Sequence, residues 1–102
     1  MLIVTPAAAL ELLAAARRSD AEGAAVRIAA RGLDDGSIEF GMGFDEPRVD
    51  DEELRFDDLT VLVGSRSRPM LKGVVLDFVE IAPDRHGFVF SRADGGREPG
   101  LA

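Results

Sequence analysis

The sequence contains no cysteine among its 102 residues, and it also lacks Trp, Tyr, Asn and Gln. Without a thiol the chain can form no disulfide, use no cysteine nucleophile, and hold neither zinc nor an iron–sulfur cluster through thiolates. Basic residues are also few, since 12 Lys and Arg stand against 19 Asp and Glu, for a net charge of −7. Nucleic-acid affinity comes largely from neutralised phosphates, so we expect no nucleic-acid partner.

Long apolar runs are absent as well. The longest weakly polar stretch, residues 7–16, contains Glu11 and is too short to span a bilayer. The N-terminus lacks the basic region and the long apolar run of a secretory signal. We therefore expect a cytoplasmic protein with no membrane partner.

What is present is enough for one folded domain, because 46% of the residues are hydrophobic. Thr5 is a suitable N-cap and Pro6 a suitable first helical residue, and the Ala- and Leu-rich stretch that follows predicts a helix to about Arg18. The spacing of Leu10 and Leu13 predicts that these two side chains face the protein interior.

After Gly23 the hydrophobic period changes from that of a helix to that of strands. The stretches predicted as strands are 2–4, 25–30, 38–44, 54–56, 59–63, 74–79 and 87–90, with one helical turn in 65–71 and a loop at 82–86. Because Gly41 and Gly43 leave one face of their strand almost bare, we expect another backbone or a bulge there. The fold class predicted is mostly β: a sandwich of mixed and antiparallel strands with one N-terminal α-helix.

Several motifs in the second half follow one another in a recognisable order. They are the buried run 59–64 (LTVLVG), the turn with Ser67, Leu71 and Gly73, the strand 76–79 (LDFV) and the strand 87–90 (GFVF). This set is similar to the A-type iron–sulfur carrier family, the HesB/IscA-like domains. The resemblance implies a HesB-like domain over 1–94, with a flexible tail at 95–102.

The same resemblance implies that the ligands of the family's cluster are missing. Family members use one Cys in a G-C-S-G-like loop and two in a C-terminal C-x-C-G motif. Asp34 occupies the position that matches the first Cys, and residues 91–100 contain no counterpart of the second motif. Carboxylates are hard ligands and do not replace thiolates on a cluster. We therefore expect no cofactor, no metal and no catalytic residue.

The function predicted from the resemblance is that of a non-catalytic interaction or accessory protein related to iron–sulfur assembly factors. Family members are commonly dimers or tetramers, so we also expect a homo-oligomer and a protein partner. The alternative is a module that binds a small ligand or a hard metal ion through the loop Asp34-Asp35-Gly36, which would need further oxygen ligands.

Other residues carry weaker chemical signals. His86 is the only imidazole and would become a general base if Asp77 or Asp84 oriented it, but a solvated loop histidine is the favoured interpretation. Arg66 and Arg68 flank a turn and could hold an anion, or simply be exposed.

The remaining polar and aromatic patterns have structural interpretations. The acidic run 50–53 is typical of a solvated surface. The six Phe residues lie at strand positions and are expected in the core rather than on a base-stacking surface.

Overall fold

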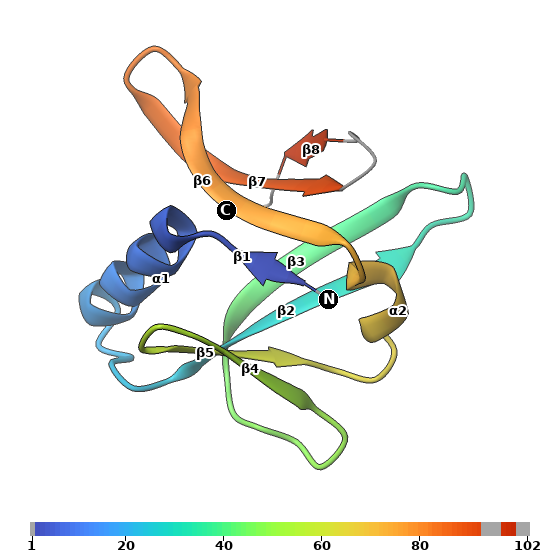
Figure 1. Cartoon of the computed structure of the whole chain (residues 1–102), viewed down its shortest axis with the longest axis horizontal. Coiled ribbons are helices and arrows are strands. Elements are labelled where there is room, and N and C mark those ends of the chain that lie inside the picture. The colour runs from blue at the N-terminus through green and yellow to red at the C-terminus, as the bar shows by residue number, and fades with distance from the viewer. Residues whose placement is uncertain (1, 93–96, 100–102) are drawn as a thin grey trace.

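Two four-stranded β-sheets face each other in the computed structural model, which describes residues 2–92 and 97–99 (Figure 1). The first sheet has the order β1 (Ile3–Val4), β6 (Val74–Ala82), β7 (Arg85–Arg92), β8 (Arg97–Pro99). The second has the order β3 (Ile38–Asp45), β2 (Ala25–Gly32), β5 (Leu59–Val63), β4 (Glu52–Phe56). The helices are α1 (Pro6–Arg18) and the single turn α2 (Arg68–Leu71).

The sheets are mixed. β1 runs parallel to β6 and β2 runs parallel to β5, while the other neighbours are antiparallel. The predicted fold class, mostly β with mixed and antiparallel strands and one N-terminal helix, is confirmed.

Helix α1 begins at the predicted cap. The Thr5 side chain accepts a hydrogen bond from the Ala8 amide (3.2 Å) and donates one to Oδ1 of Asp77 (2.7 Å). The Thr5 amide also donates to the carbonyl of Leu76 on β6 (3.0 Å). The start of the helix is therefore attached to β6 as well as capped.

The predicted inward face of α1 is right for Leu13, which is half-buried and packs against the core, but wrong for Leu10. The buried residues are Ala8, Ala9, Leu12 and Ala16, whereas Leu10 is 68% exposed. The hydrogen bonds of Thr5 fix the start of the helix on β6. The small alanine side chains then let the helix lie close to the strands.

The core between the sheets is apolar and tightly packed, as the predicted strand pattern requires. Ile28, Val61 and Leu76 are fully buried. Phe40 of β3 stacks on Phe90 of β7 with ring centroids 4.5 Å apart and planes at 7°. Because the two rings come from different sheets, this stack joins the halves of the molecule.

Two details differ from the sequence predictions. The expected approach to Gly41 and Gly43 is wrong, because a Cβ built at either would meet nothing within 4 Å. The predicted loop at 82–86 is wrong as well, because β6 and β7 continue to Ala82 and Arg85 and leave a two-residue turn. The turn consists of Pro83 and Asp84, and the φ of 61° at Asp84 allows the chain to reverse within these two residues.

The tail predicted as flexible, 95–102, is only partly described. Within it, Arg97–Pro99 forms β8 and pairs with β7. Residues 95–96 and 100–102 lie outside the described residues. No helix in the described part of the chain is long and apolar enough to cross a membrane.

Candidate functional site

The loop that carries Asp34 is the tip of the hairpin between β2 and β3. The amide of Leu33 donates to the carbonyl of Ser37 (2.8 Å), and Gly36 adopts a φ of +87°, which favours glycine. Oδ1 of Asp35 accepts hydrogen bonds from the amide (3.0 Å) and the hydroxyl (2.6 Å) of Ser37. These hydrogen bonds hold the turn and lower the pKa of Asp35. The neighbouring Asp34 is exposed.

This loop does not form a metal centre in the described structure. Among the described residues, no three His, Cys, Asp or Glu side chains gather closely enough to hold a metal ion. A hard cation such as Ca²⁺ takes six to eight oxygen ligands, and one of the two carboxylates here is already bonded to Ser37.

His86 lies on β7 near the exposed end of the long hairpin that β6 and β7 form (Figure 1). Its ring stacks on Phe78, with centroids 5.8 Å apart. Asp77, one of its proposed orienting partners, instead accepts hydrogen bonds from Thr5 and from the Phe78 amide (2.8 Å). Within the described residues no hydrogen bond joins His86 to Asp77 or Asp84, so the geometry of a general base is not assembled.

An ion cluster around Arg27 is the most strongly bonded polar group of the described structure, and the sequence did not reveal it. Nη1 and Nη2 of Arg27 bind the two carboxylate oxygens of Asp51 at 2.7 and 2.8 Å. Nε donates to Asp45 (2.7 Å), and Nη2 also donates to the carbonyl of Glu46 (3.2 Å). Four donor contacts from one side chain of β2 hold the β3–β4 loop against the sheet.

The cluster changes the acid strength of its members. Hydrogen bonding to Arg27 lowers the pKa of Asp51 to about 2 and lowers the pKa of Asp45, and the two carboxylates raise the pKa of Arg27. The side chain of Asp51 is only 2% exposed. The interpretation of 50–53 as a wholly solvated surface is therefore wrong at Asp51. The available signal was a single Arg in the otherwise apolar stretch 25–30 of this acidic chain.

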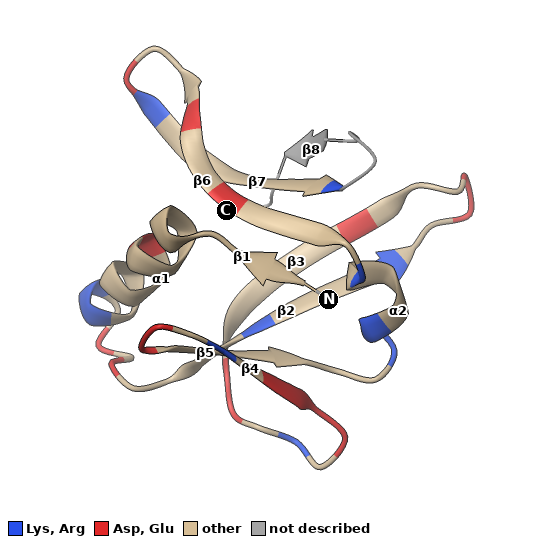
Figure 2. Cartoon of the chain, in the orientation of Figure 1, with Lys and Arg blue, Asp and Glu red and all other residues tan. Residues whose placement is uncertain are grey.

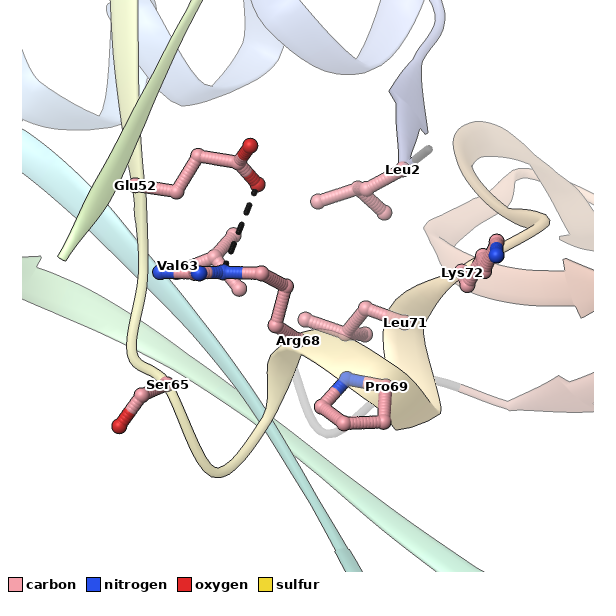
Figure 3. Close-up of a pocket in the computed structure, with 8 residues that line it drawn as sticks. All are labelled: Leu2, Glu52, Val63, Ser65, Arg68, Pro69, Leu71 and Lys72. Carbon is pink, nitrogen blue, oxygen red and sulfur yellow. Dashed lines mark ion pairs between the residues drawn. The ribbon is translucent and has the colours of Figure 1, made fainter.

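A pocket of about 530 Å³ opens beside α2 and reaches toward β5 and β1 (Figure 3). Its apolar residues are Leu2, Val63, Pro69 and Leu71. Leu2, Val63 and Leu71 are 1–3% exposed, since they belong to the core that closes the bottom of the pocket. These three side chains are therefore covered by the core and offer a ligand almost no surface.

The polar residues of this pocket come from three segments and lie toward its mouth. They are Glu52 of β4, Ser65, Arg68 of α2 and Lys72. Nε of Arg68 is 3.9 Å from Oε1 of Glu52, and its Nη2 donates to the carbonyl of Asp50 (3.1 Å). The pocket thus combines an apolar floor with two cations and one carboxylate.

The structure separates the two arginines that the sequence analysis considered together. Arg68 lines the larger pocket, whereas Arg66 lines a neighbouring hollow of about 260 Å³ that also contains Arg27 and Asp51. Asp34 and His86 line neither of these pockets. The candidate residues are therefore dispersed over the molecule.

The turn motif of the resemblance has a clear structural role. The hydroxyl of Ser67 accepts a hydrogen bond from the Ala30 amide (3.0 Å) and donates to the Ala30 carbonyl (3.3 Å), which attaches α2 to β2. Leu71 fills the core, and Gly73 turns the chain into β6 with a φ of +78°. These residues maintain the scaffold and do not converge on a reactive group.

Sequence comparison finds a partial relative of this chain. No protein-family model matches the sequence. The chain is 41% identical over 70 residues to the uncharacterized protein blr1755 of Bradyrhizobium diazoefficiens, a match over 69% of this chain and 64% of that protein. The chain therefore spans slightly less than two thirds of this relative's length.

Two solved structures share the whole architecture. A crystal structure of IscA with a 2Fe–2S cluster has a TM-score of 0.77 at 21% identity, covering 100% of this chain and 99% of that one. Escherichia coli SufA, described as involved in biosynthesis of iron–sulfur clusters, has a TM-score of 0.74 at 23% identity, covering 99% of this chain and 88% of that one. The chain therefore has the fold of IscA and SufA, as the resemblance predicted, and it has this fold without any cysteine.

Proposed function

We propose that this protein is a non-catalytic interaction or accessory protein that uses the IscA and SufA scaffold in the cytoplasm without carrying an iron–sulfur cluster. One observation carries the proposal: a fold that holds a cluster in IscA is combined here with a sequence that has no thiol. Protein-bound clusters depend on soft sulfur ligands.

The distribution of the motif residues supports this separation of scaffold and chemistry. The turn of Ser67, Leu71 and Gly73 keeps its bonds and its packing. The position that matches the family's first ligand is Asp34, an exposed carboxylate at a hairpin tip. A scaffold that keeps its strands and turns but lacks the ligands fits an interaction role, because binding a protein needs a surface and not a cluster.

Anaerobic reconstitution with ferrous iron and sulfide tests the loss of cluster binding. We expect no stable protein-bound cluster, and hence no charge-transfer absorption after gel filtration. IscA, whose crystal structure contains a 2Fe–2S cluster, serves as the control for the reaction when treated in the same way. A cluster retained by this chain in stoichiometric amounts would contradict the proposal.

Affinity capture from the protein's own cells tests the interaction role, with the captured proteins identified by mass spectrometry. Recovery of iron–sulfur assembly proteins would support a role beside that machinery, and unrelated partners would indicate a scaffold used elsewhere. Sedimentation velocity measures the homo-oligomer that we also propose; a monomer at all concentrations tested would contradict that part.

A further inference from the structure

We propose that the free edge of β3 pairs with the same edge of a second copy of this chain, antiparallel and with Gly41 on the two-fold axis. The two four-stranded sheets that contain β3 would then form one continuous eight-stranded sheet. This inference rests on the homo-oligomer of the proposed function and names the surface that would form it.

β3 is the least protected edge among the described strands. The order of the sheets leaves four edge strands, β1, β8, β3 and β4. β1 has two residues, β8 has three and ends in proline, and β4 carries Glu52 and Glu53. Short strands, proline and charge keep an edge from pairing with another chain. β3 has eight residues with charge only at Glu39 and Asp45, and in Figure 2 most of it is uncharged whereas much of β4 is acidic.

The hydrogen bonds of β2 indicate which backbone groups of β3 point outward. The amide and the carbonyl of Ala30 both bond the hydroxyl of Ser67, which lies on the side of β2 away from β3. Because the pairs of an antiparallel ladder alternate, Ala30 and Phe40 form a pair without hydrogen bonds between them. The backbone groups that point to the free edge are therefore those of the even-numbered residues, 38 to 44.

This parity allows only registers in which even residues face even ones. With Gly41 opposite its own copy, Phe40 of one chain lies opposite Met42 of the other, and Ile38 lies opposite Phe44. These four side chains share one face of the joint sheet. Ile38 and Met42 are half-buried against the core and Phe44 is 37% exposed, so the pairing removes apolar surface from water.

The acidic residues of β3 select this register among the allowed ones. Glu39 lies opposite Gly43, which has no side chain. A shift by two residues in one direction would place Glu39 opposite Asp45, and like charges directly opposite each other destabilise a sheet. A shift in the other direction would pair a shorter stretch and leave Phe44 outside it.

A second copy fits this edge because the edge is self-complementary. Apolar side chains meet apolar ones on one face, and an acidic side chain meets a glycine on the other. A Cβ built at Gly41 or Gly43 would meet nothing within 4 Å, so no side chain stands over this part of the strand. A strand of a different protein is the competing occupant.

Cysteine cross-linking tests the pairing, because a cysteine introduced into this chain is its only thiol. In the proposed register residue 41 meets its own copy in a pair without hydrogen bonds, whose Cα atoms lie about 4.5 Å apart. That separation permits a disulfide. We expect mild oxidation of Gly41→Cys to give a disulfide-linked dimer on electrophoresis without reductant. Gly43→Cys is the matched control and should give little, because its two copies lie about 13 Å apart along the strands.

A mixture of two variants tests the register. Glu39→Cys and Gly43→Cys should each cross-link poorly alone, since neither residue meets its own copy. An equal mixture of the two should form a disulfide-linked heterodimer, because residues 39 and 43 lie opposite each other. Mass spectrometry distinguishes this heterodimer from the two homodimers.

A proline variant tests the backbone hydrogen bonds. Met42→Pro removes an amide that points to the free edge and none that bonds β2, a position at which an edge strand tolerates proline. Sedimentation velocity should show the dissociation constant of the dimer rise about tenfold or more, since one amide is lost from each copy. Circular dichroism checks the fold of this variant, and the cysteine experiments test the pairing independently of it.

Three results would overturn the inference. They are no disulfide-linked dimer of Gly41→Cys, equal cross-linking of Gly43→Cys, and a dimer that a folded Met42→Pro leaves unchanged. A strand of another protein captured by Gly41→Cys in place of a second copy would overturn it as well. Each result leaves the loss of cluster binding in place, because reconstitution with iron and sulfide tests that separately.

Discussion

At the scale of single residues, Arg27 does more than any other described polar side chain to connect distant segments. It lies on β2 and binds Asp45 and Asp51 from both ends of the β3–β4 loop. The sequence shows an arginine in an apolar strand and an acidic loop, but not that the two meet. Their contact depends on how the loop returns along the sheet, which no local pattern encodes.

Asp51 is expected to make the protein sensitive to acid. Its pKa in the folded protein is about 2, below the ordinary value of 3.8. A lowered pKa stabilises the fold fully above about pH 4, and this contribution is lost as the pH falls toward 2. In Asp51→Asn, the free energy of unfolding should be lower at pH 6 and should fall less steeply between pH 4 and 2.

Urea unfolding at several pH values measures this difference. Asp34→Asn, at an exposed position, is the control and should follow the parent protein. If Asp51→Asn and the parent lost stability with the same slope between pH 4 and 2, the bond to Arg27 would not have the role assigned to it.

At the scale of elements, the sequence predicted most helices and strands but not their ends or rotations. Two strands were predicted well because their signals depend only on neighbouring residues. The alternating stretch 38–44 lies in β3, and the apolar run 59–63 forms β5. For α1 the prediction was right for Leu13 and wrong for Leu10, because the side of the helix that faces the core depends on contacts between distant residues, such as Thr5 and Asp77, which are 72 positions apart. The pocket beside α2 was not predictable for the same reason.

Gly73 tests the turn that leads from α2 into β6. Its φ of +78° is unfavourable for residues with a Cβ, so Gly73→Ala should lower the free energy of unfolding by about 1–2 kcal/mol. Gly43→Ala is the control, because its backbone is extended and a Cβ there would meet nothing within 4 Å. Denaturant unfolding of both variants gives the comparison, and equal losses would show that the turn geometry is not the cause.

At the scale of the whole molecule, the two sheets depend on side chains that cross between them. The motifs 76–79 and 87–90 allowed the fold to be predicted, because their positions are compatible with one known scaffold. The sequence also marked Arg68 as a possible anion contact, but it did not show that Glu52 of β4 lies 3.9 Å from this guanidinium, because that contact forms only after the sheet and α2 have packed.

Phe90 is the residue through which the sheets are expected to be most strongly coupled. It is 1% exposed and stacks on Phe40 of the opposite sheet. Phe90→Ala should destabilise the protein by about 3–5 kcal/mol, a large part of the roughly 5–15 kcal/mol typical of a domain. Phe44→Ala, at a side chain that is 37% exposed, should cost much less.

Thermal unfolding followed by circular dichroism compares these two variants. A single cooperative transition at a much lower temperature is expected for Phe90→Ala. Equal shifts for the two variants would show that the stack does not couple the sheets.

The pairing of β1 with β6 has a consequence for how the protein is made. Ile3 lies beside Val75, and Thr5 is bonded to Asp77 across 72 positions. During translation, β1 and the cap of α1 therefore cannot form these contacts with β6 until the last third of the chain has left the ribosome. Until then the alanine-rich helix lacks β6, the strand that it contacts most, so nascent chains released early should be the substrates of chaperones and proteases.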